Sequence, residues 1–300
     1  MKILLLGVNG KLGTDLYSHL SQFVEFDITP STRKDFNLYD YKSIKEFLNN
    51  VCPDIVINCI AATNLYECES NNELAFSVNA NFVKYLARAS IKDEIPIIHF
   101  STEHIFDGNK LTPYIETDSP NPINIYGISK LYGEKFLSEI TPKFYIFRIS
   151  WLTCKNGTSF FSRIIENIKK NEEFNVVNDQ LGAPVTTLFI AEIITKIIRK
   201  DIISSFDYGT YHMTPMGYIS RYLLAKFILN RLNRDKFFGN YSKVKIQPIT
   251  TELIKSNVRY PLNCILNSNK LIKAYPDKIK SWDYYFNLNI EEYLKVYGKY

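Results

Sequence analysis

The sequence of 300 residues has no long hydrophobic run, and a membrane-spanning helix needs about 20 consecutive apolar residues. It also has no low-complexity tract, internal repeat or block of one charge that would mark a linker between independent domains. Its first residues, Met1 to Gly7, are apolar but run straight into a glycine turn, which favours a buried strand over a signal sequence. We therefore predict a globular protein that has no contact with a membrane.

Cysteine is scarce, and none of the five cysteines forms a C-x-x-C pair or stands at a spacing to histidine that suits zinc. This pattern predicts reduced thiols, no metal site and a cytoplasmic location. The net charge is only +5 and the lysines are scattered, which argues against a nucleic acid partner. A small anionic ligand agrees with such a charge.

A glycine-rich turn follows the first apolar run, Lys2 to Leu6, and precedes leucines at helical spacing. In this context, glycines three residues apart permit a tight turn and a close approach of backbone N–H groups to a pyrophosphate. The turn therefore predicts a dinucleotide site. Its expected residues are Gly7, Gly10, Lys11, Leu12 and Gly13.

A second strand is expected over Val24–Thr29, and the adenosine ribose of a dinucleotide should lie at its end. Arg33 follows it and is suited to a 2′-phosphate, which favours NADPH, although NADH stays possible and a solvated basic loop is the other interpretation. Asp27 is the acidic alternative for a 2′-hydroxyl, but it stands early in the strand. Asn37 and Leu38 are also expected on the cofactor side.

Two further strands are predicted to end at the ligand edge of the sheet. Pro53–Thr63 is nearly continuous in apolar residues, as expected for a strand covered on both faces, and its end is lined by Ala61, Ala62 and Thr63. The strand from Ile95 ends at Ser101 and Thr102, whose hydroxyls either orient a substrate oxygen or cap the strand.

Tyr126 and Lys130 are the strongest candidates for chemistry. Four residues apart on a helix, they project from one face, one turn apart. A nearby ammonium lowers the pKa of a phenol, whereas burial raises it. A tuned tyrosine donates a proton to a carbonyl oxygen.

Strands and helices alternate over residues 1–155, which predicts an α/β fold with a doubly wound parallel sheet. Residues 156–300 are expected mainly to form a smaller substrate lobe, with parts of 172–212 completing the sheet. Helices are predicted over Thr158–Ile168, Leu188–Ile198 and Tyr218–Leu232.

Six motifs in order make the chain resemble the dTDP-4-dehydrorhamnose reductases, a family of extended short-chain dehydrogenase/reductases. The motifs are Gly7-x-x-Gly10-x-x-Gly13, Ser101-Thr102-Glu103-His104-Ile-Phe-Asp-Gly108, Tyr126-Gly-x-Ser-Lys130, Arg148-x-Ser-Trp151, Asp179-Gln180-x-Gly182-x-Pro184 and Gly209-Thr-Tyr-His212. The resemblance covers nearly the whole chain. It implies a Rossmann domain and NAD(P)H-dependent reduction of the C4 ketone of a nucleotide-diphosphate sugar.

The resemblance also implies roles for single residues. Thr102, Tyr126 and Lys130 match the catalytic residues, with Lys130 also binding the nicotinamide ribose. Trp151 matches a sugar-contacting residue, although a tryptophan at this place also suits a core. Arg259 lies in the Arg-x-Pro-x-Asn block and is suited to a diphosphate. Glu103 stands on the substrate side, where the family has aspartate.

Several alternatives stay open. Several departures from the family pattern lie on the substrate side, at Glu103, Val185 and Cys264 among others, so a different sugar or nucleotide is possible; Asn37 stands where the family has an adenosine-side aspartate. A dehydratase would carry Thr-Asp-Glu where this chain has Thr102-Glu103-His104, and no acid/base pair of an epimerase is evident. A non-catalytic NADP-binding subunit, like the regulatory subunit of methionine adenosyltransferase, is the alternative from another class. A homodimer is one possible assembly.

Overall fold

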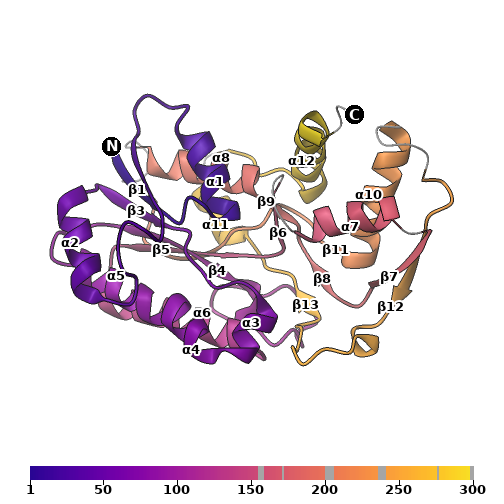
Figure 1. The fold of residues 1–300 in the computed structure, drawn as a ribbon, viewed down its shortest axis with the longest axis horizontal. Coiled ribbons are helices and arrows are strands. Elements are labelled where there is room, and N and C mark those ends of the chain that lie inside the picture. The colour runs from indigo at the N-terminus through magenta and orange to yellow at the C-terminus, as the bar shows by residue number, and fades with distance from the viewer. Residues whose placement is uncertain (155–158, 171, 200–205, 236–240, 276, 298–300) are drawn as a thin grey trace.

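The fold is built on a six-stranded parallel sheet (Figure 1). The structure is a computed structural model that describes residues 1–154, 159–170, 172–199, 206–235, 241–275 and 277–297. The strand order is β10-β5-β4-β3-β1-β2, with all neighbours parallel. The strands are β1 (Lys2–Leu6), β2 (Asp27–Ser31), β3 (Ile55–Asn58), β4 (Ile97–Thr102), β5 (Phe144–Ile149) and β10 (Gly209–His212). The predicted fold class is confirmed.

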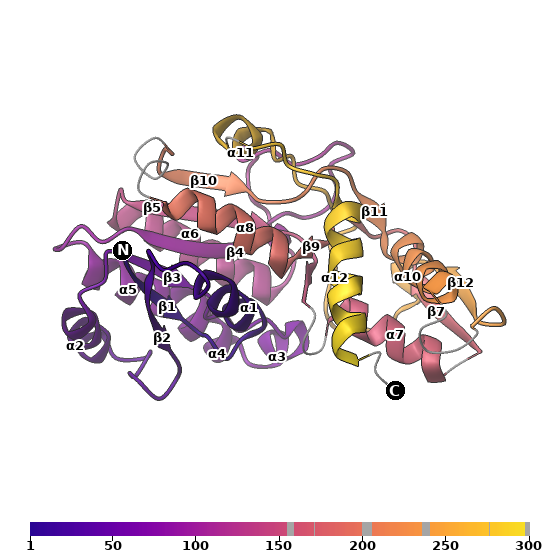
Figure 2. The same ribbon diagram turned by 90° about the horizontal axis from the view of Figure 1, so that it is seen from above.

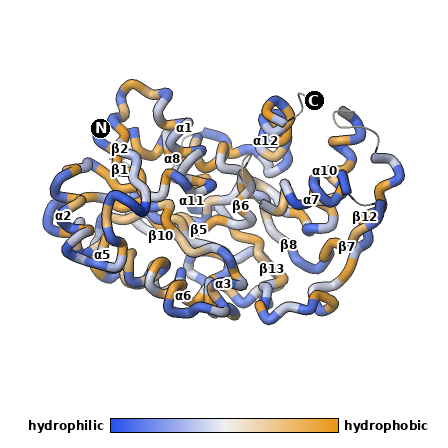
Figure 3. The backbone as a smooth tube through the Cα atoms, in the orientation of Figure 1, coloured by the Kyte–Doolittle hydropathy of each residue, from blue (hydrophilic) through white to orange (hydrophobic). Residues whose placement is uncertain are grey.

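Helices cover both faces of the sheet, which is why its central strands are mostly hydrophobic (Figure 3). One face carries α1 (Lys11–Leu20) and α8 (Thr187–Ile198), whose leucines and isoleucines pack on it. The other face carries α2 (Tyr41–Val51), α5 (Phe82–Ser90) and α6 (Ile125–Ile140). The two layers are the doubly wound arrangement that the alternating pattern predicts.

The helical segment between β3 and β4 is a composite of several pieces. It consists of α4 (Asn72–Phe76), a π-helical turn (Ser77–Asn81) and α5, preceded by α3 (Leu65–Ser70). The π turn directs the buried Asn79 toward the ligand edge of the sheet, where its amide bonds both backbone groups of Ala62 at 2.9 Å and Ser129 Oγ at 2.9 Å. Asn79 thus fixes the loop after β3 to helix α6.

A second lobe lies beside the sheet (Figure 2). Its helices α7 (Phe160–Lys170), α10 (Arg221–Asp235) and α12 (Trp282–Tyr297) share a hydrophobic core. The remaining elements are β6 (Leu152–Thr153), β7 (Glu173–Val177), β8 (Leu181–Gly182), β9 (Val185–Thr186), β11 (Ile219–Ser220), β12 (Lys245–Ile249), β13 (Asn263–Cys264), α11 (Asn269–Ala274) and two 3₁₀ helices, Glu103–Ile105 and Thr251–Leu253.

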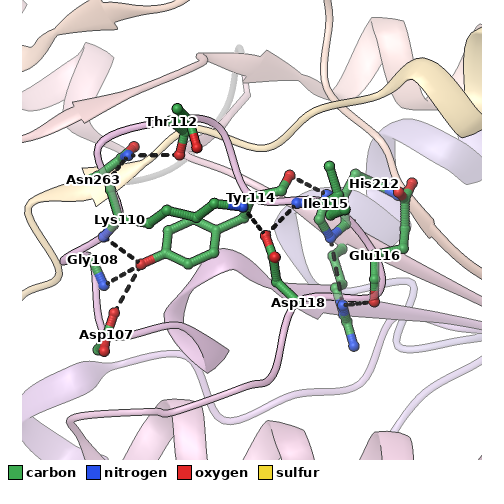
Figure 4. Close-up of polar contacts among 11 residues, drawn as sticks. Asp107, Gly108, Lys110, Thr112, Tyr114, Ile115, Glu116, Asp118, His212 and Asn263 are labelled. Carbon is green, nitrogen blue, oxygen red and sulfur yellow. Dashed lines mark hydrogen bonds and ion pairs between the residues drawn. The ribbon is translucent and has the colours of Figure 1, made fainter.

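An irregular segment, residues 107–118, ties the sheet to the C-terminal part of the chain (Figure 4). The Tyr114 hydroxyl donates to Asp107 at 2.8 Å and accepts from the backbone of Gly108 at 3.0 Å. Asn263 Nδ2 donates to the Thr112 carbonyl at 3.2 Å, and the His212 backbone donates to Glu116 at 2.9 Å. These bonds hold the lobe against the ligand edge.

Several predicted boundaries were wrong. β2 covers Asp27–Ser31, so Asp27 pairs with Lys2 at the opposite edge from the glycine turn and cannot reach the ribose. The third strand ends at Asn58, and α10 begins at Arg221 because residues 219–220 pair with β8. The predicted domain boundary at 155, like the start of the Thr158 helix, lies outside the described residues. No helix in the described ranges is long and apolar enough to span a membrane.

Candidate active site

A cavity of about 560 Å³ opens where the carboxyl ends of β1, β3, β4 and β5 meet α7 and α10 of the second lobe. Ligands of doubly wound sheets collect at this edge. All three predicted catalytic residues, Thr102, Tyr126 and Lys130, line the cavity together with the predicted substrate residues Glu103 and Trp151. Residues far apart in the sequence are therefore brought together.

The glycine turn forms one end of this cavity. Gly7 has φ +81°, and a Cβ on Gly13 would lie 2.2 Å from the Gly7 carbonyl oxygen, so neither position tolerates a side chain without rearrangement. Gly10 caps α1 without a side-chain hydrogen bond. The first turn of α1 can therefore receive an anionic group at its N-terminus, which fits the pyrophosphate of a dinucleotide.

The predicted cofactor residues divide into two groups. Gly10, Lys11, Leu12, Ala61, Thr63, Tyr126 and Lys130 line the cavity. The others lie outside its wall. Gly7 and Gly13 shape the turn, and Ala62 is held by Asn79. Arg33 is exposed two residues after β2, whereas Leu38 is buried in the core and Asn37 accepts from the Tyr39 backbone at 3.0 Å.

Helix α6 positions Tyr126 and Lys130 because its N-terminus is fixed on both sides. The Asn124 side chain caps the helix by accepting from the Gly127 backbone at 2.8 Å. Glu69 of α3 accepts from the Ile125 backbone at 3.0 Å. The ring of Tyr126 meets His104 edge-on, with centroids 5.6 Å apart.

The expectation that Lys130 lowers the pKa of Tyr126 is not met in this structure. Burial raises the pKa of the Tyr126 phenol, the Glu103 carboxylate raises it further, and a hydrogen bond with Thr102 lowers it. Lys130 Nζ donates instead to the Phe100 carbonyl at 2.7 Å and lies 3.1 Å from His99 Nε2. Burial lowers the pKa of Lys130 to about 8, against the opposing effect of Glu134.

Thr102 has a double role. Its hydroxyl donates to Glu103 Oε2 at 2.8 Å and accepts from the His104 backbone at 3.2 Å. It is thus a cap, as one interpretation of the sequence held, and it also lines the cavity. A hydroxyl has one proton, so Thr102 must turn away from Glu103 to donate to a substrate oxygen.

The sequence did not predict the two arginines that line the substrate side of the cavity. Arg221 and Arg163 line the cavity, whereas the predicted Arg259 is exposed outside its wall. Arg259 contacts the site through its backbone: its carbonyl accepts from Nδ2 of Asn124, the residue that caps α6, at 2.9 Å. Arg221 opens a helix after a strand of two residues, and no sequence motif singled it out.

Trp151 is both a core residue and a cavity residue, the two interpretations that the sequence left open. It is 8% exposed and belongs to the core cluster of the second lobe, yet it also lines the cavity. It does not end β5, which stops at Ile149, and it adopts a positive φ of 35°. A Cβ on Gly182 would lie 2.6 Å from its ring, so the glycine makes room for the indole.

None of the five cysteines, all of which lie in the described part of the chain, forms a disulfide. Among the residues that the structure describes, no group of three or more His, Cys, Asp or Glu side chains is placed to hold a metal ion.

A doubly wound sheet with a glycine turn after its first strand and a Tyr–Lys pair beside a threonine defines a short-chain dehydrogenase/reductase. The chain matches the RmlD substrate binding domain family over residues 1–295. It therefore belongs to this family, which includes the dTDP-4-dehydrorhamnose reductases, and the resemblance found in the sequence is confirmed.

Three relatives illustrate this membership. The dTDP-4-dehydrorhamnose reductase of Burkholderia thailandensis is 31% identical, covering 98% of this chain and 99% of the relative. The crystal structure of the Bacillus anthracis enzyme of the same name, in complex with NADP, has a TM-score of 0.88 at 30% identity and covers 97% of this chain and 99% of the other. A dTDP-4-keto-6-deoxy-D-glucose reductase of Streptomyces niveus is 28% identical over 93% of both chains.

Proposed function

We propose that this protein uses NADPH to reduce the C4 ketone of a dTDP-linked 4-keto-6-deoxy sugar, with dTDP-4-dehydrorhamnose as the first candidate. The observation that carries the proposal is the meeting of Tyr126, Lys130 and Thr102 in one cavity that begins at a dinucleotide-type glycine turn. The names of the relatives support the same chemistry.

The residues present fit the cofactor. The N-terminus of α1, from Gly10 to Leu12, would receive the pyrophosphate, and Tyr126 and Lys130 would hold the nicotinamide ribose. Reduced nicotinamide supplies a hydride when it is bound. Arg33 stands near the end of β2, where an adenosine 2′-phosphate would lie, which favours NADPH over NADH.

The protein's own groups complete the reduction. Tyr126 donates its phenolic proton to the developing alkoxide, and its raised pKa keeps that proton in place at neutral pH. Thr102 donates a hydrogen bond to the same oxygen after it turns from Glu103. Trp151 lines the cavity beside the sugar, and Arg221 and Arg163 bind the diphosphate.

A panel of nucleotide sugars tests the proposal. Oxidation of NADPH should be seen with dTDP-linked 4-keto-6-deoxy sugars and should be weak with their UDP- or GDP-linked counterparts. Binding of NADPH without turnover of any such sugar would favour the non-catalytic subunit instead.

The Streptomyces niveus relative makes a different 4-keto sugar a second candidate for the substrate. A homodimer and a cytoplasmic location stay predictions.

A further inference from the structure

At the wall of the cavity, three buried polar side chains form a line. Asn58 ends β3, His99 lies within β4, and Lys130 reaches them from α6; each is at most 1% exposed. Asn58 Nδ2 lies 3.1 Å from His99 Nδ1, and His99 Nε2 lies 3.1 Å from Lys130 Nζ. His99 therefore joins the asparagine to the lysine through its two ring nitrogens.

The orientation of the Asn58 amide fixes the tautomer of His99. Asn58 Oδ1 accepts from the Ile60 backbone N–H at 3.0 Å, so the amide nitrogen must face His99. An amide nitrogen only donates, and His99 Nδ1 must therefore accept. Burial holds the pKa of His99 well below its usual value, so the ring is neutral. Its one proton then stands on Nε2, the nitrogen that faces Lys130.

This arrangement has a consequence for Lys130. An ammonium has three donors and no acceptor, so His99 Nε2–H and a charged Lys130 would face each other as two donors. A neutral amine accepts from Nε2–H through its lone pair and still donates to the Phe100 carbonyl. Every bond in the line is then satisfied, which is the rule for buried polar groups.

We propose that Asn58 and His99 are positioning residues that set the protonation state of Lys130 by holding the His99 proton on Nε2 and so favouring the neutral amine. This role rests on the proposed function, because it matters for turnover only if Lys130 serves the reduction at Tyr126. Asn58 lines the cavity, whereas His99 lies outside its wall, and both act on Lys130 through the position of the His99 proton.

The other titratable groups around Lys130 do not explain the effect. Glu134, one turn further along α6, raises the pKa of Lys130, but its carboxylate is bound by Arg148 Nη2 at 2.7 Å. Burial raises the pKa of the Cys59 thiol, which is therefore neutral, and the Tyr126 phenol also keeps its proton. His99 is the group that meets Nζ directly.

Nuclear magnetic resonance tests the proposal without requiring turnover. In the full-length protein labelled with ¹⁵N-histidine and ¹³C-lysine, the long-range ¹⁵N spectrum should show His99 protonated on Nε2. The Cε shift of Lys130 should titrate near pH 8. A His99 ring protonated on Nδ1, or on both nitrogens, would overturn the proposal.

Two variants test the link between His99 and Lys130. His99→Gln adds no charge and can turn its carbonyl oxygen toward Lys130, so the pKa of Lys130 should rise by about one unit, roughly one charge-assisted hydrogen bond. Asn58→Asp leaves an oxygen for Ile60 and should move the His99 proton to Nδ1. His212→Gln, at another fully buried histidine, is the matched control and should leave Lys130 unchanged.

An unchanged Lys130 titration in His99→Gln, or a shift of equal size in the His212→Gln control, would contradict the proposal. Failure of the proposed function is recognised separately. In that case, the wild-type protein would show the Nε2 tautomer and the lysine titration but would not oxidise NADPH with any sugar nucleotide.

Discussion

The guanidinium of Arg221 lies 4.1 Å from the centre of the Trp151 ring. Burial lowers the pKa of Arg221 from its usual value, and its Nε donates to Gln180 at 2.9 Å, so the cation is fixed over the ring. Gly182 also contacts the Trp151 ring, and because it has no side chain it leaves room for the indole. The contacts with Arg221 and Gly182 thus fix the orientation of the Trp151 ring at the boundary between the second lobe and the cavity.

Trp151→Ala should lose both stability and substrate affinity. Truncating a buried tryptophan costs about 3–5 kcal/mol, because it leaves a cavity in the lobe core. The KM for the sugar nucleotide should rise while NADPH affinity stays the same, which steady-state kinetics and cofactor titration measure. Trp282→Ala, at a partly buried tryptophan that packs against the same core but lies outside the cavity wall, should lower the melting temperature alone. An unchanged KM in the Trp151 variant would show that Trp151 has only a structural role in the core.

Arg221→Met keeps the apolar stem of the side chain and removes its charge. If Arg221 binds the diphosphate, the KM for the sugar nucleotide should rise about ten- to hundredfold, the worth of a charge-assisted hydrogen bond. Arg259→Met is the control, and its exposed side chain predicts little change. A raised KM in Arg259→Met with an unchanged KM in Arg221→Met would show that Arg259, and not Arg221, binds the diphosphate.

Arg33→Ala tests the choice of cofactor. A bond to an exposed phosphate contributes about 1.5–3 kcal/mol, so the wild type should bind NADPH more tightly than NADH and the variant should lose most of this difference. The neighbouring Lys34→Ala should retain it. Fluorescence titration with both cofactors measures the four affinities. Equal affinity of the wild type for NADPH and NADH would rule out a 2′-phosphate contact.

Glu103→Gln should lower the pKa of Tyr126. The Glu103 carboxylate raises this pKa, because it opposes a negative phenolate nearby, and the amide removes that charge. The tyrosine would then lose its proton at a lower pH than in the wild type. The Cζ shift of Tyr126 in ¹³C-tyrosine-labelled protein follows this titration. A Tyr126 pKa that stays unchanged or moves upward would contradict this role of Glu103.

The sequence predicts what depends on local spacing. The glycine turn before α1 and the pair Tyr126 and Lys130 on one face of α6 follow from residues within a few positions of each other. Alternating strands and helices likewise give the sheet class. Element ends were displaced, as with β2, because pairing with β1 rather than hydrophobicity fixes where this strand stops.

The sequence does not predict contacts between distant segments. Arg221 reaches the cavity through the pairing of β11 with β8, about which spacing says nothing. Lys130 turns to His99 and Phe100 because β4 lies under α6, and no pattern within α6 shows this. Arg259 was chosen for its motif, yet its backbone rather than its side chain contacts the site.

The central claim is that Tyr126 gives the proton in the reduction of a sugar ketone. Tyr126→Phe keeps the ring, and Tyr132→Phe, which removes the same hydroxyl from an exposed tyrosine of this helix outside the cavity wall, is the control. With dTDP-4-dehydrorhamnose and NADPH, the rate of NADPH oxidation should fall about 10²–10⁴-fold in the Tyr126 variant, while its affinity for NADPH stays close to that of the wild type. A Tyr126→Phe variant that oxidises NADPH at nearly the wild-type rate would contradict the claim.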